Sequence, residues 1–330
     1  MTMIAFMRRA LAGSLALFLG AAFAGECAAE TITVTHWGSQ FYGAPYAVAM
    51  DKGFFKKRGV DITGILTSTG GGTSVRNTLA GDLPFGEVAL SAAVEAIEAG
   101  QPIKIVCAGV ESVADILWIA KPGSPLNSIK DIVGKKIAYT SPGSVTNMLI
   151  LMAMKASGIR PDQVTIVPAG GVGANLTAVL SGAVDTAMTG EPIWSQSKSK
   201  VKAVFWTKDV LPANMTQTVG IVTEEFAKQQ PDKIRAIIEG RREGVQYIAQ
   251  HPDESADIVA KTYNIDAALT REVFKHFLAI DYWSEGAFDY AAMNRMIEGL
   301  QIVGKLKGPM DWPKVIEMAF LPQDLRAKTH

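Results

Sequence analysis

Two glycine-rich segments of this 330-residue chain could bind a small anion through their backbone. Residues 68–74 read STGGGTS and residues 170–173 read GGVG, and a helical pattern follows each segment. Backbone N–H groups at a helix start are free to donate, and the helix dipole favours negative charge there. Donors without a cation suit sulfonate, carboxylate or nitrate oxygens, although the first segment could equally be a flexible turn. The candidate ligand-binding residues here are Thr69, Gly71, Thr73 and Gly171.

Aromatic and hydrogen-bonding side chains follow the first predicted strand, at residues 32–35. The segment from position 36 to position 42 reads HWGSQFY. Ligands of open parallel sheets bind beyond the carboxyl ends of the strands, so this segment is placed to form the walls of a binding site. His36 could instead be a satisfied surface histidine, and Trp37 or Tyr42 could belong to the core. The candidates in this segment are His36, Trp37, Gln40 and Tyr42.

Further polar candidates lie after later strands. Ser144 and Thr146 stand between a strand and a helix, where a hydroxyl can cap the helix, contact a ligand, or do both through different atoms. Glu191 precedes Pro192, a residue type that starts helices. Its carboxylate could accept hydrogen bonds from an amine or ring N–H of a solute, stabilise the helix start, or join a hinge salt bridge. Ser91 completes the set of candidate ligand-binding residues.

Catalytic and metal-binding patterns have little support in this sequence. His251 and His276 lack metal-ligand spacing, His330 is terminal, and no nucleophile–base pair can be proposed from spacing. A phosphate-binding G-x-x-x-x-G-K-[ST] loop is absent from the sequence. The prediction is a binding protein with no catalytic residues, no metal and no cofactor.

A duplicated unit positions the two glycine-rich segments. In each copy the loop leads to a helix that ends on Leu-small-Gly and then to a short strand, over residues 70–89 and again over residues 170–188. This duplication indicates two similarly built α/β lobes that face each other as a clamp. Apolar β-rich runs alternate with helix patterns up to about residue 206, which predicts parallel sheets with crossover helices.

The pattern becomes helical from Glu224 onward, and such a tail must pack on a lobe. Crossings near residues 117–121 and 216–220 would then join the lobes as a hinge. Helices are expected from Pro231 and at residues 253–263, 267–278 and 288–304. The expected division is a signal peptide at 1–29, a first lobe at 30–118, a second lobe at 119–216, and residues 217–330 that return to the first lobe and form the tail.

The N-terminal residues predict export. Arg8 and Arg9 precede an apolar run at residues 10–23, shorter than the roughly 20 residues of a membrane-spanning helix, and small residues follow it. Cleavage could fall after Ala24 or after Ala29, whereas Glu26 argues against a lipid anchor on Cys27. The 32 basic and 32 acidic residues balance, so no nucleic-acid partner is expected. A periplasmic location follows from the predicted signal peptide.

Several short motifs in consistent order resemble one family, the solute-binding proteins of the nitrate, sulfonate and taurine ABC importers. The likeness spans roughly Thr31 to Phe226 and is specific through the order of its pieces. These pieces are Gly53-Phe54-Phe55, Gly59-Val60-Asp61-Ile62, Gly134-Lys135-Lys136-Ile137-Ala138, Leu180-Ser181-Gly182-Ala183-Val184-Asp185 and Gly190-Glu191-Pro192.

The resemblance implies a bilobed periplasmic-binding-protein fold that closes over one small molecule. It also implies delivery to a membrane permease that an ATPase subunit drives, by a protein that does not itself hydrolyse ATP. The duplicated unit and the two crossings predict that this protein is a monomer. The expected solute is a small anionic or zwitterionic organic molecule such as taurine, with a pyrimidine or an aromatic acid as the alternative. Thiamine-pyrimidine synthases share this superfamily, but their cysteine-rich iron motif is missing here. A sensor subunit would look the same in sequence.

Overall fold

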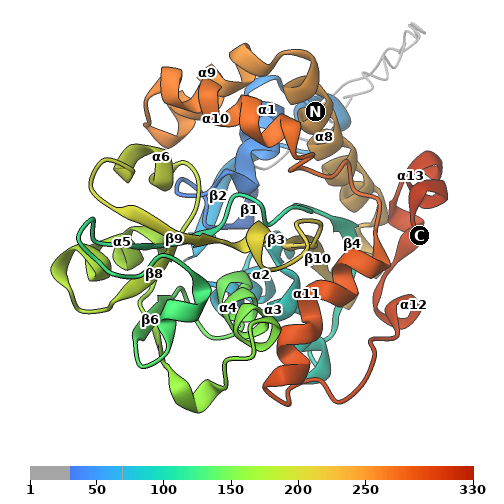
Figure 1. Cartoon of the computed structure of the whole chain (residues 1–330). Coiled ribbons are helices and arrows are strands. Elements are labelled where there is room, and N and C mark those ends of the chain that lie inside the picture. The colour runs from blue at the N-terminus through green and yellow to red at the C-terminus, as the bar shows by residue number, and fades with distance from the viewer. Residues whose placement is uncertain (1–29, 69) are drawn as a thin grey trace, which may run out of the picture.

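Two five-stranded sheets form the frame of the protein (Figure 1). The computed structural model describes residues 30–68 and 70–330, so the predicted signal peptide lies outside the described residues. The first sheet has the strand order β2 (Ile62–Ser68), β1 (Glu30–Thr35), β3 (Phe85–Ala89), β10 (Thr218–Thr223) and β4 (Ile103–Ala108). The second has the order β7 (Thr165–Pro168), β6 (Lys136–Tyr139), β8 (Thr186–Thr189), β5 (Leu117–Ala120) and β9 (Lys202–Trp206). We call each sheet with its covering helices a lobe.

Both sheets are mixed, whereas the alternation of strands and helices predicted parallel sheets. β10 runs antiparallel to both β3 and β4, and β5 runs antiparallel to both β8 and β9. The reversed strands are those with which the chain enters a sheet after crossing from the other one. A strand that arrives without a crossover helix is free to run in the opposite direction, so one strand of each sheet departs from the parallel pattern.

The chain passes between the sheets twice, through residues 109–116 after β4 and residues 207–217 after β9. The sequence predicted the first crossing near residues 117–121. Residues 117–120 instead form β5, so the crossing ends just before them. A second difference concerns β2, which was expected at residues 60–62. This strand begins at Ile62 and continues to Ser68, since its pairing with β1 runs from Glu30 to Thr35. A hinge at the two crossings stays a prediction.

The helices cover both sheets and build the tail. The duplicated unit of the sequence corresponds to α2 with β3 and to α5 with β8. Helices up to the last strand are α1 (Ala44–Asp51), α2 (Gly71–Ala80), α3 (Leu90–Glu98), α4 (Val145–Ala156), α5 (Val172–Ser181) and α6 (Ile193–Ser197). The tail contains α7 (Glu224–Gln229), α8 (Pro231–Gln250), α9 (Pro252–Tyr263), α10 (Ala267–Ala279), α11 (Tyr290–Ile302), α12 (Trp312–Val315) and α13 (Gln323–Lys328).

The tail contacts both lobes. In Figure 1, α8 and α9 lie beside α1 of the first lobe and α10 lies beside α9, whereas α11 lies beside α3 and α4. At Gly299 of α11 an added Cβ would lie 2.9 Å from the Met148 Cα atom of α4, so these helices pack closely. The sequence assigned the tail to the first lobe alone, and the α11–α4 contact extends it to the second lobe.

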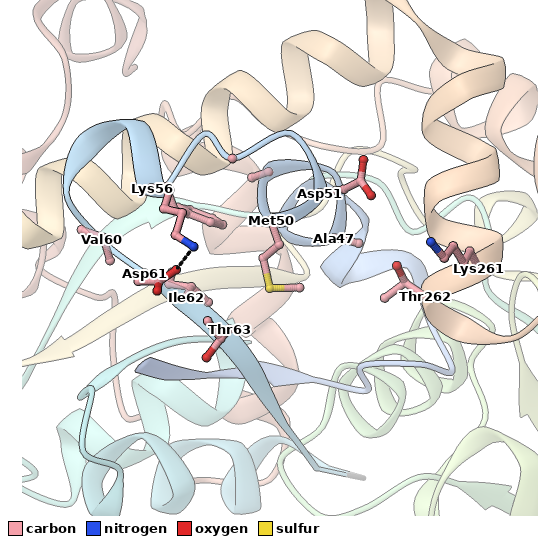
Figure 2. Close-up of a pocket in the computed structure, with 13 residues that line it drawn as sticks. Ala47, Met50, Asp51, Lys56, Val60, Asp61, Ile62, Thr63, Lys261 and Thr262 are labelled. Carbon is pink, nitrogen blue, oxygen red and sulfur yellow. Dashed lines mark ion pairs between the residues drawn. The ribbon is translucent and has the colours of Figure 1, made fainter. Parts of the chain in front are cut away.

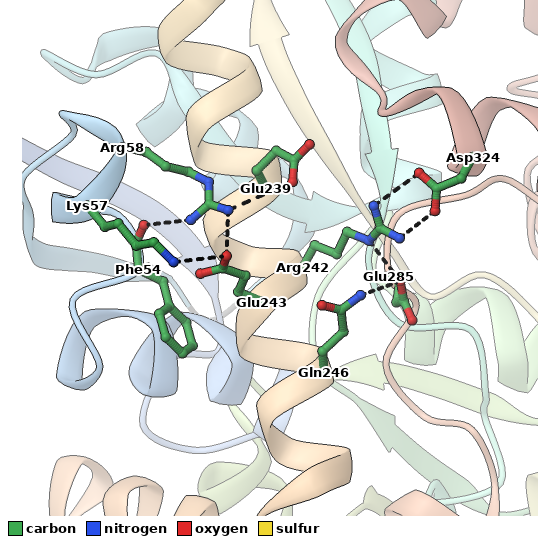
Figure 3. A network of polar contacts seen from close by, with 9 residues as sticks. All are labelled: Phe54, Lys57, Arg58, Glu239, Arg242, Glu243, Gln246, Glu285 and Asp324. Atoms are coloured by element: carbon green, nitrogen blue, oxygen red, sulfur yellow. Dashed lines mark hydrogen bonds and ion pairs between the residues drawn. The ribbon is translucent and has the colours of Figure 1, made fainter.

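Helix α8 is the main support of the tail. Pro231 is its first residue, as the sequence predicted, and its apolar face is buried at Ile234, Ile237, Ile238 and Ile248. Ion pairs hold its two polar sides (Figure 3). Arg58 Nη2 lies 2.6 Å from Glu243 Oε1 on one side, and on the other Arg242 Nε donates to Glu285 Oε2 at 2.8 Å. Within residues 30–68 and 70–330, no helix is long and apolar enough to cross a membrane.

Candidate functional site

The carboxyl ends of strands from both sheets meet at one cleft between the lobes. Residues from the ends of β1 and β3 face residues from the ends of β6 and β8, the position at which α/β proteins bind ligands. The hollow is small, about 20 Å³, which is room for roughly one water molecule. Its lining consists of Thr35, His36, Gln40, Tyr42, Gly71, Ala89, Thr140, Ser144, Val145, Thr146, Val172 and Met188.

Charged side chains are missing from this lining, in which no described residue is a lysine, an arginine or a carboxylate. The imidazole of His36 is also neutral near pH 7, because burial lowers its pKa to about 4. His36 lies 6.3 Å from the Tyr42 ring, centroid to centroid, and adopts a left-handed backbone with φ of 53°. The cleft therefore offers neutral hydrogen-bonding groups and one aromatic pair.

Helices from both lobes begin at this cleft. Gly71 is the first residue of α2, and Val172 is the first residue of α5, so the duplicated units do face each other as the sequence predicted. The third helix, α4, starts after Ser144, whose Oγ accepts a hydrogen bond from the Asn147 N–H at 3.2 Å. The first N–H groups of a helix have no acceptor within it, so the cleft gathers backbone donors and the positive ends of three dipoles.

Hydroxyl groups add further donors on the second-lobe side. Thr146 Oγ1 accepts from the Thr140 N–H at 3.1 Å and lies 2.9 Å from Thr140 Oγ1 and 3.1 Å from Ser144 Oγ. Ser144 thus caps α4 and lines the cleft at once, as the sequence allowed. All three side chains are buried, which fixes the directions in which their hydroxyl groups can donate.

A buried polar network connects the cleft to the two crossing segments. Tyr42 OH donates to Gln217 Oε1 at 2.7 Å, and Gln217 Nε2 donates to Asp115 Oδ1 at 3.2 Å. Tyr282 OH of the tail donates to Asp115 Oδ2 at 3.3 Å. Burial raises the pKa of Asp115 to about 7, although its hydrogen bonds act in the opposite direction. The network joins a cleft aromatic ring to residues 109–116, residues 207–217 and the tail.

Six of the twelve predicted binding residues line the cleft: His36, Gln40, Tyr42, Gly71, Ser144 and Thr146. The others do not. Thr69 lies outside the described residues. Trp37 packs edge-on against the Tyr263 ring, with centroids 5.0 Å apart, and Thr73 is exposed on α2, where its Oγ1 accepts from Arg76. Ser91 is fully buried, and its Oγ donates across the cleft to the Gly143 carbonyl at 2.9 Å.

The two remaining predicted residues lie just outside the hollow. Gly171 precedes the first residue of α5. The Glu191 carboxylate accepts from the Ser195 Oγ at 2.9 Å and from the Ser195 N–H at 3.2 Å, so it does stabilise the start of α6. It lines a second hollow of about 250 Å³ between α6 and α10, together with Trp194 and His276. Burial raises the pKa of Glu191. Contact of either residue with a solute stays a prediction.

Sequence reasoning missed other lining residues. Thr35 and Thr140 end or follow strands that the sequence did predict, so the rule that ligands bind at strand ends could have found them. Asp115 and Gln217 had no such signal. Their importance comes from the meeting of segments about a hundred residues apart in the chain.

Another hollow of the first lobe is separate from the cleft. Figure 2 shows this hollow, of about 510 Å³, between the end of α1, the start of β2 and the end of α9. The Lys56–Asp61 ion pair lies on one side of it and Lys261 on the other. None of the eleven predicted residues that the structure describes lines it. Among the residues that the structure describes, no group of His, Cys, Asp and Glu side chains is arranged to hold a metal.

Known structures share this fold. The alkanesulfonate-binding protein SsuA from Xanthomonas axonopodis, bound to MOPS, superposes with a TM-score of 0.73 at 14% identity, over 89% of this chain and 100% of that one. The periplasmic nitrate-binding protein NrtA from Synechocystis PCC 6803 superposes with a TM-score of 0.72 at 16% identity, over 92% of each chain. The bilobed fold implied by the resemblance is confirmed.

Two sequence relatives point to different classes of protein. A "Putative binding protein" of Brucella abortus is 25% identical over 286 residues, which cover 84% of this chain and 85% of that protein. The 4-amino-5-hydroxymethyl-2-methylpyrimidine phosphate synthase of Legionella pneumophila is 23% identical over 237 residues, which cover 68% of this chain and 71% of that enzyme. The NMT1/THI5-like family model matches residues 40–255, well over half of the sequence, and the chain therefore belongs to the NMT1/THI5-like family.

Proposed function

We propose that this protein is the periplasmic solute-binding subunit of an ABC importer. It captures a small organic solute between its lobes and delivers it, as a monomer, to a membrane permease that an ATPase subunit drives. The main support is the convergence of three helix N-termini and several buried hydroxyl groups on a cleft with no charged side chain in its lining. That arrangement binds and orients, and it offers no nucleophile with an activating base. The protein is accordingly a binder in this proposal, not an enzyme.

The proposed solute is a small anionic or zwitterionic sulfonate or carboxylate, such as taurine. Backbone N–H groups of α2, α4 and α5 supply donors for the oxygens of its anionic end. Glu191 is assigned to an amine at the other end, because the residue is buried and a buried charge is stabilised by a cationic partner. The hollow of about 20 Å³ is far too small for such a solute, so binding requires the lobes to separate first.

The test is a thermal-shift screen followed by calorimetry with taurine, ethanesulfonate and nitrate. A ligand at a hundredfold excess over its Kd stabilises the folded state by about 2.7 kcal/mol, which raises the melting temperature measurably. We expect taurine to bind more tightly than ethanesulfonate, and nitrate, which has no donor for Glu191, to bind weakest. Glu191→Gln should weaken taurine binding selectively. Equal affinities of the wild type and Glu191→Gln for every ligand bound would remove Glu191 from the site.

A matched pair of threonine variants locates the site. Thr146 lines the cleft, whereas Thr63 lines the hollow of Figure 2. Thr146→Val keeps the side-chain shape and removes one hydroxyl, which typically weakens binding of a charged group by about tenfold or more. Thr63→Val should leave affinity unchanged. The reverse pattern would place the solute in the other hollow.

A pyrimidine or an aromatic acid is the alternative solute. The neutral His36 imidazole and the Tyr42 ring lie in the same cleft and could flank a planar ring. The screen therefore includes a hydroxymethylpyrimidine and benzoate. Chromatography of the mixture after incubation separates the functions, because a binder returns its ligand unchanged and an enzyme does not.

A further inference from the structure

A hydrogen bond joins α3 of the first lobe directly to the turn before α4 in the second lobe. Ser91 lies in the first turn of α3, in the first lobe, and its Oγ donates to the Gly143 carbonyl of the second lobe at 2.9 Å. Ser91 is completely buried, so water does not compete for this hydrogen bond. The acceptor is 52 residues further along the chain, in the turn between β6 and α4.

The Gly143 carbonyl is held in a fixed direction. Gly143 has a left-handed backbone with φ of 72°, and its N–H donates to Asn147 Oδ1 at 3.2 Å. The Asn147 N–H in turn donates to Ser144 Oγ, the cap of α4. A second residue of α3 also touches this turn, because an added Cβ at Gly143 would lie 2.8 Å from Glu95 Oε2. Glu95 is itself paired with Lys305 of the tail.

Glycines allow the lobes to approach this closely. A Cβ at Gly71 would lie 3.0 Å from the Gly143 carbonyl oxygen and 2.7 Å from the Ala92 Cβ. A Cβ at Gly70 would lie 2.0 Å from Ser141 Oγ, on the second lobe. At Gly70 and Gly71 the two lobes therefore meet without an intervening first-lobe side chain, and the hollow enclosed beside this contact holds no more than a water molecule.

We infer that Ser91 is a positioning residue that holds the two lobes closed through Gly143, and that it does not contact the solute. The hydrogen bond exists only when the lobes meet, so removing it destabilises the closed state relative to the open state. A neutral hydrogen bond of this kind changes the ratio of closed to open molecules about two- to tenfold. Its effect on solute binding rests on the proposed function, whereas the contact between the lobes does not.

The test measures lobe separation in the ligand-free protein by pulsed electron paramagnetic resonance. Spin labels are attached through Lys56→Cys and Asp162→Cys, at side chains that are 71% and 69% exposed, with Cys27 replaced by serine. These positions precede β2 and β7, the edge strands on the far side of each sheet from the reversed strand. Cys107 is buried and stays unlabelled. We expect Ser91→Ala to move part of the distance distribution to longer values.

Two further variants complete the test. Ser255→Ala removes a fully buried hydroxyl without a partner in α9, so it should leave the distances unchanged. Gly143→Ala disturbs the same contact from the second lobe and should lengthen them like Ser91→Ala. Distances in Ser91→Ala and Gly143→Ala equal to those of the wild type would overturn the inference. If taurine, ethanesulfonate and nitrate all fail to bind, the proposed solute class fails, and the label distances still decide the role of Ser91.

Discussion

Asp115, in the first crossing segment, is connected to the cleft residue Tyr42 by hydrogen bonds through Gln217. Its carboxyl group is fully buried and receives hydrogen bonds from the Gln217 amide and the Tyr282 hydroxyl, with no lysine or arginine among these partners. The negative charge of Glu191 also raises the pKa of Asp115. Without a cation, burial favours the neutral acid, and the pKa of Asp115 rises to about 7.

This pKa predicts a specific pH dependence of stability. The folded protein keeps a proton on Asp115 that the unfolded chain, with an ordinary pKa of about 3.9, has already released. The Asp115 contribution to the free energy of unfolding is therefore fully present below about pH 4 and is lost as the pH rises to about 7. Asp115→Asn removes this loss, so the variant should gain stability relative to the wild type as the pH increases. Urea unfolding from pH 4 to pH 8 measures the difference.

Two outcomes of that titration are informative. A difference between Asp115→Asn and wild type that stays constant with pH would show that Asp115 is ionised throughout. Glu111 provides a comparison in the same crossing segment, because burial also raises its pKa to about 7. Glu111 has no hydrogen bond to Gln217 or Tyr42, so Glu111→Gln should alter stability with the same sign and leave the cleft unaffected.

At the scale of elements, one buried ion pair fastens α8 to the first sheet. Arg241 Nε of α8 donates to Glu87 Oε2 of β3 at 2.8 Å, and both side chains are almost completely buried. The remaining donors of Arg241 reach the Ser284 carbonyl at 2.7 Å and the Gly109 carbonyl at 3.0 Å. Thr218 Oγ1 of β10 donates to the other Glu87 oxygen at 2.7 Å. A strand, a crossing segment and the tail thus share one satisfied network.

Breaking this pair from one side should be costly. Arg241→Met leaves the Glu87 carboxylate buried without its cation, and such a change typically destabilises by about 3–5 kcal/mol. The double variant Glu87→Gln/Arg241→Met removes the uncompensated charge and should recover part of that loss. Urea unfolding of the wild type, both single variants and the double variant closes the cycle. Additive losses would mean that the two side chains do not interact in the folded protein.

The sequence was sufficient for elements whose pattern is local. Pro231, the buried isoleucines of α8 and the repeated loop–helix–strand unit predicted helices and strands that the structure contains. The reversed strand β10 was not predicted, because its direction depends on where the chain returns after residue 206. Ser91 shows the same limit within the site. Its residue type suggests a ligand contact, but its hydroxyl binds the Gly143 carbonyl. That contact depends on the relative position of the two lobes, which the local sequence does not contain.

At the scale of the whole molecule, the tail limits how the lobes can move. Helix α11 contacts α3 of the first lobe and α4 of the second, and Met148 packs directly against Gly299. If the lobes separate, α11 must either slide along α3 and α4 or move with one lobe and lose its contact with the other. The lobes are therefore connected at three places, which are the crossing segments, the Ser91–Gly143 hydrogen bond and helix α11. Opening or closing of the lobes must change the structure at each of them.

The order of the strands also has a consequence for how the chain folds. All five strands of the second sheet lie within residues 117–206, whereas the first sheet is incomplete until β10, beginning at Thr218, inserts between β3 and β4. Pairing β10 with β4 closes a loop that contains the whole second sheet. Closing so long a loop is entropically unfavourable, and strands far apart in the sequence pair slowly. We expect pulsed hydrogen exchange during refolding to protect amides of β6 and β8 before those of β10. Simultaneous protection would indicate that both sheets form in a single cooperative step.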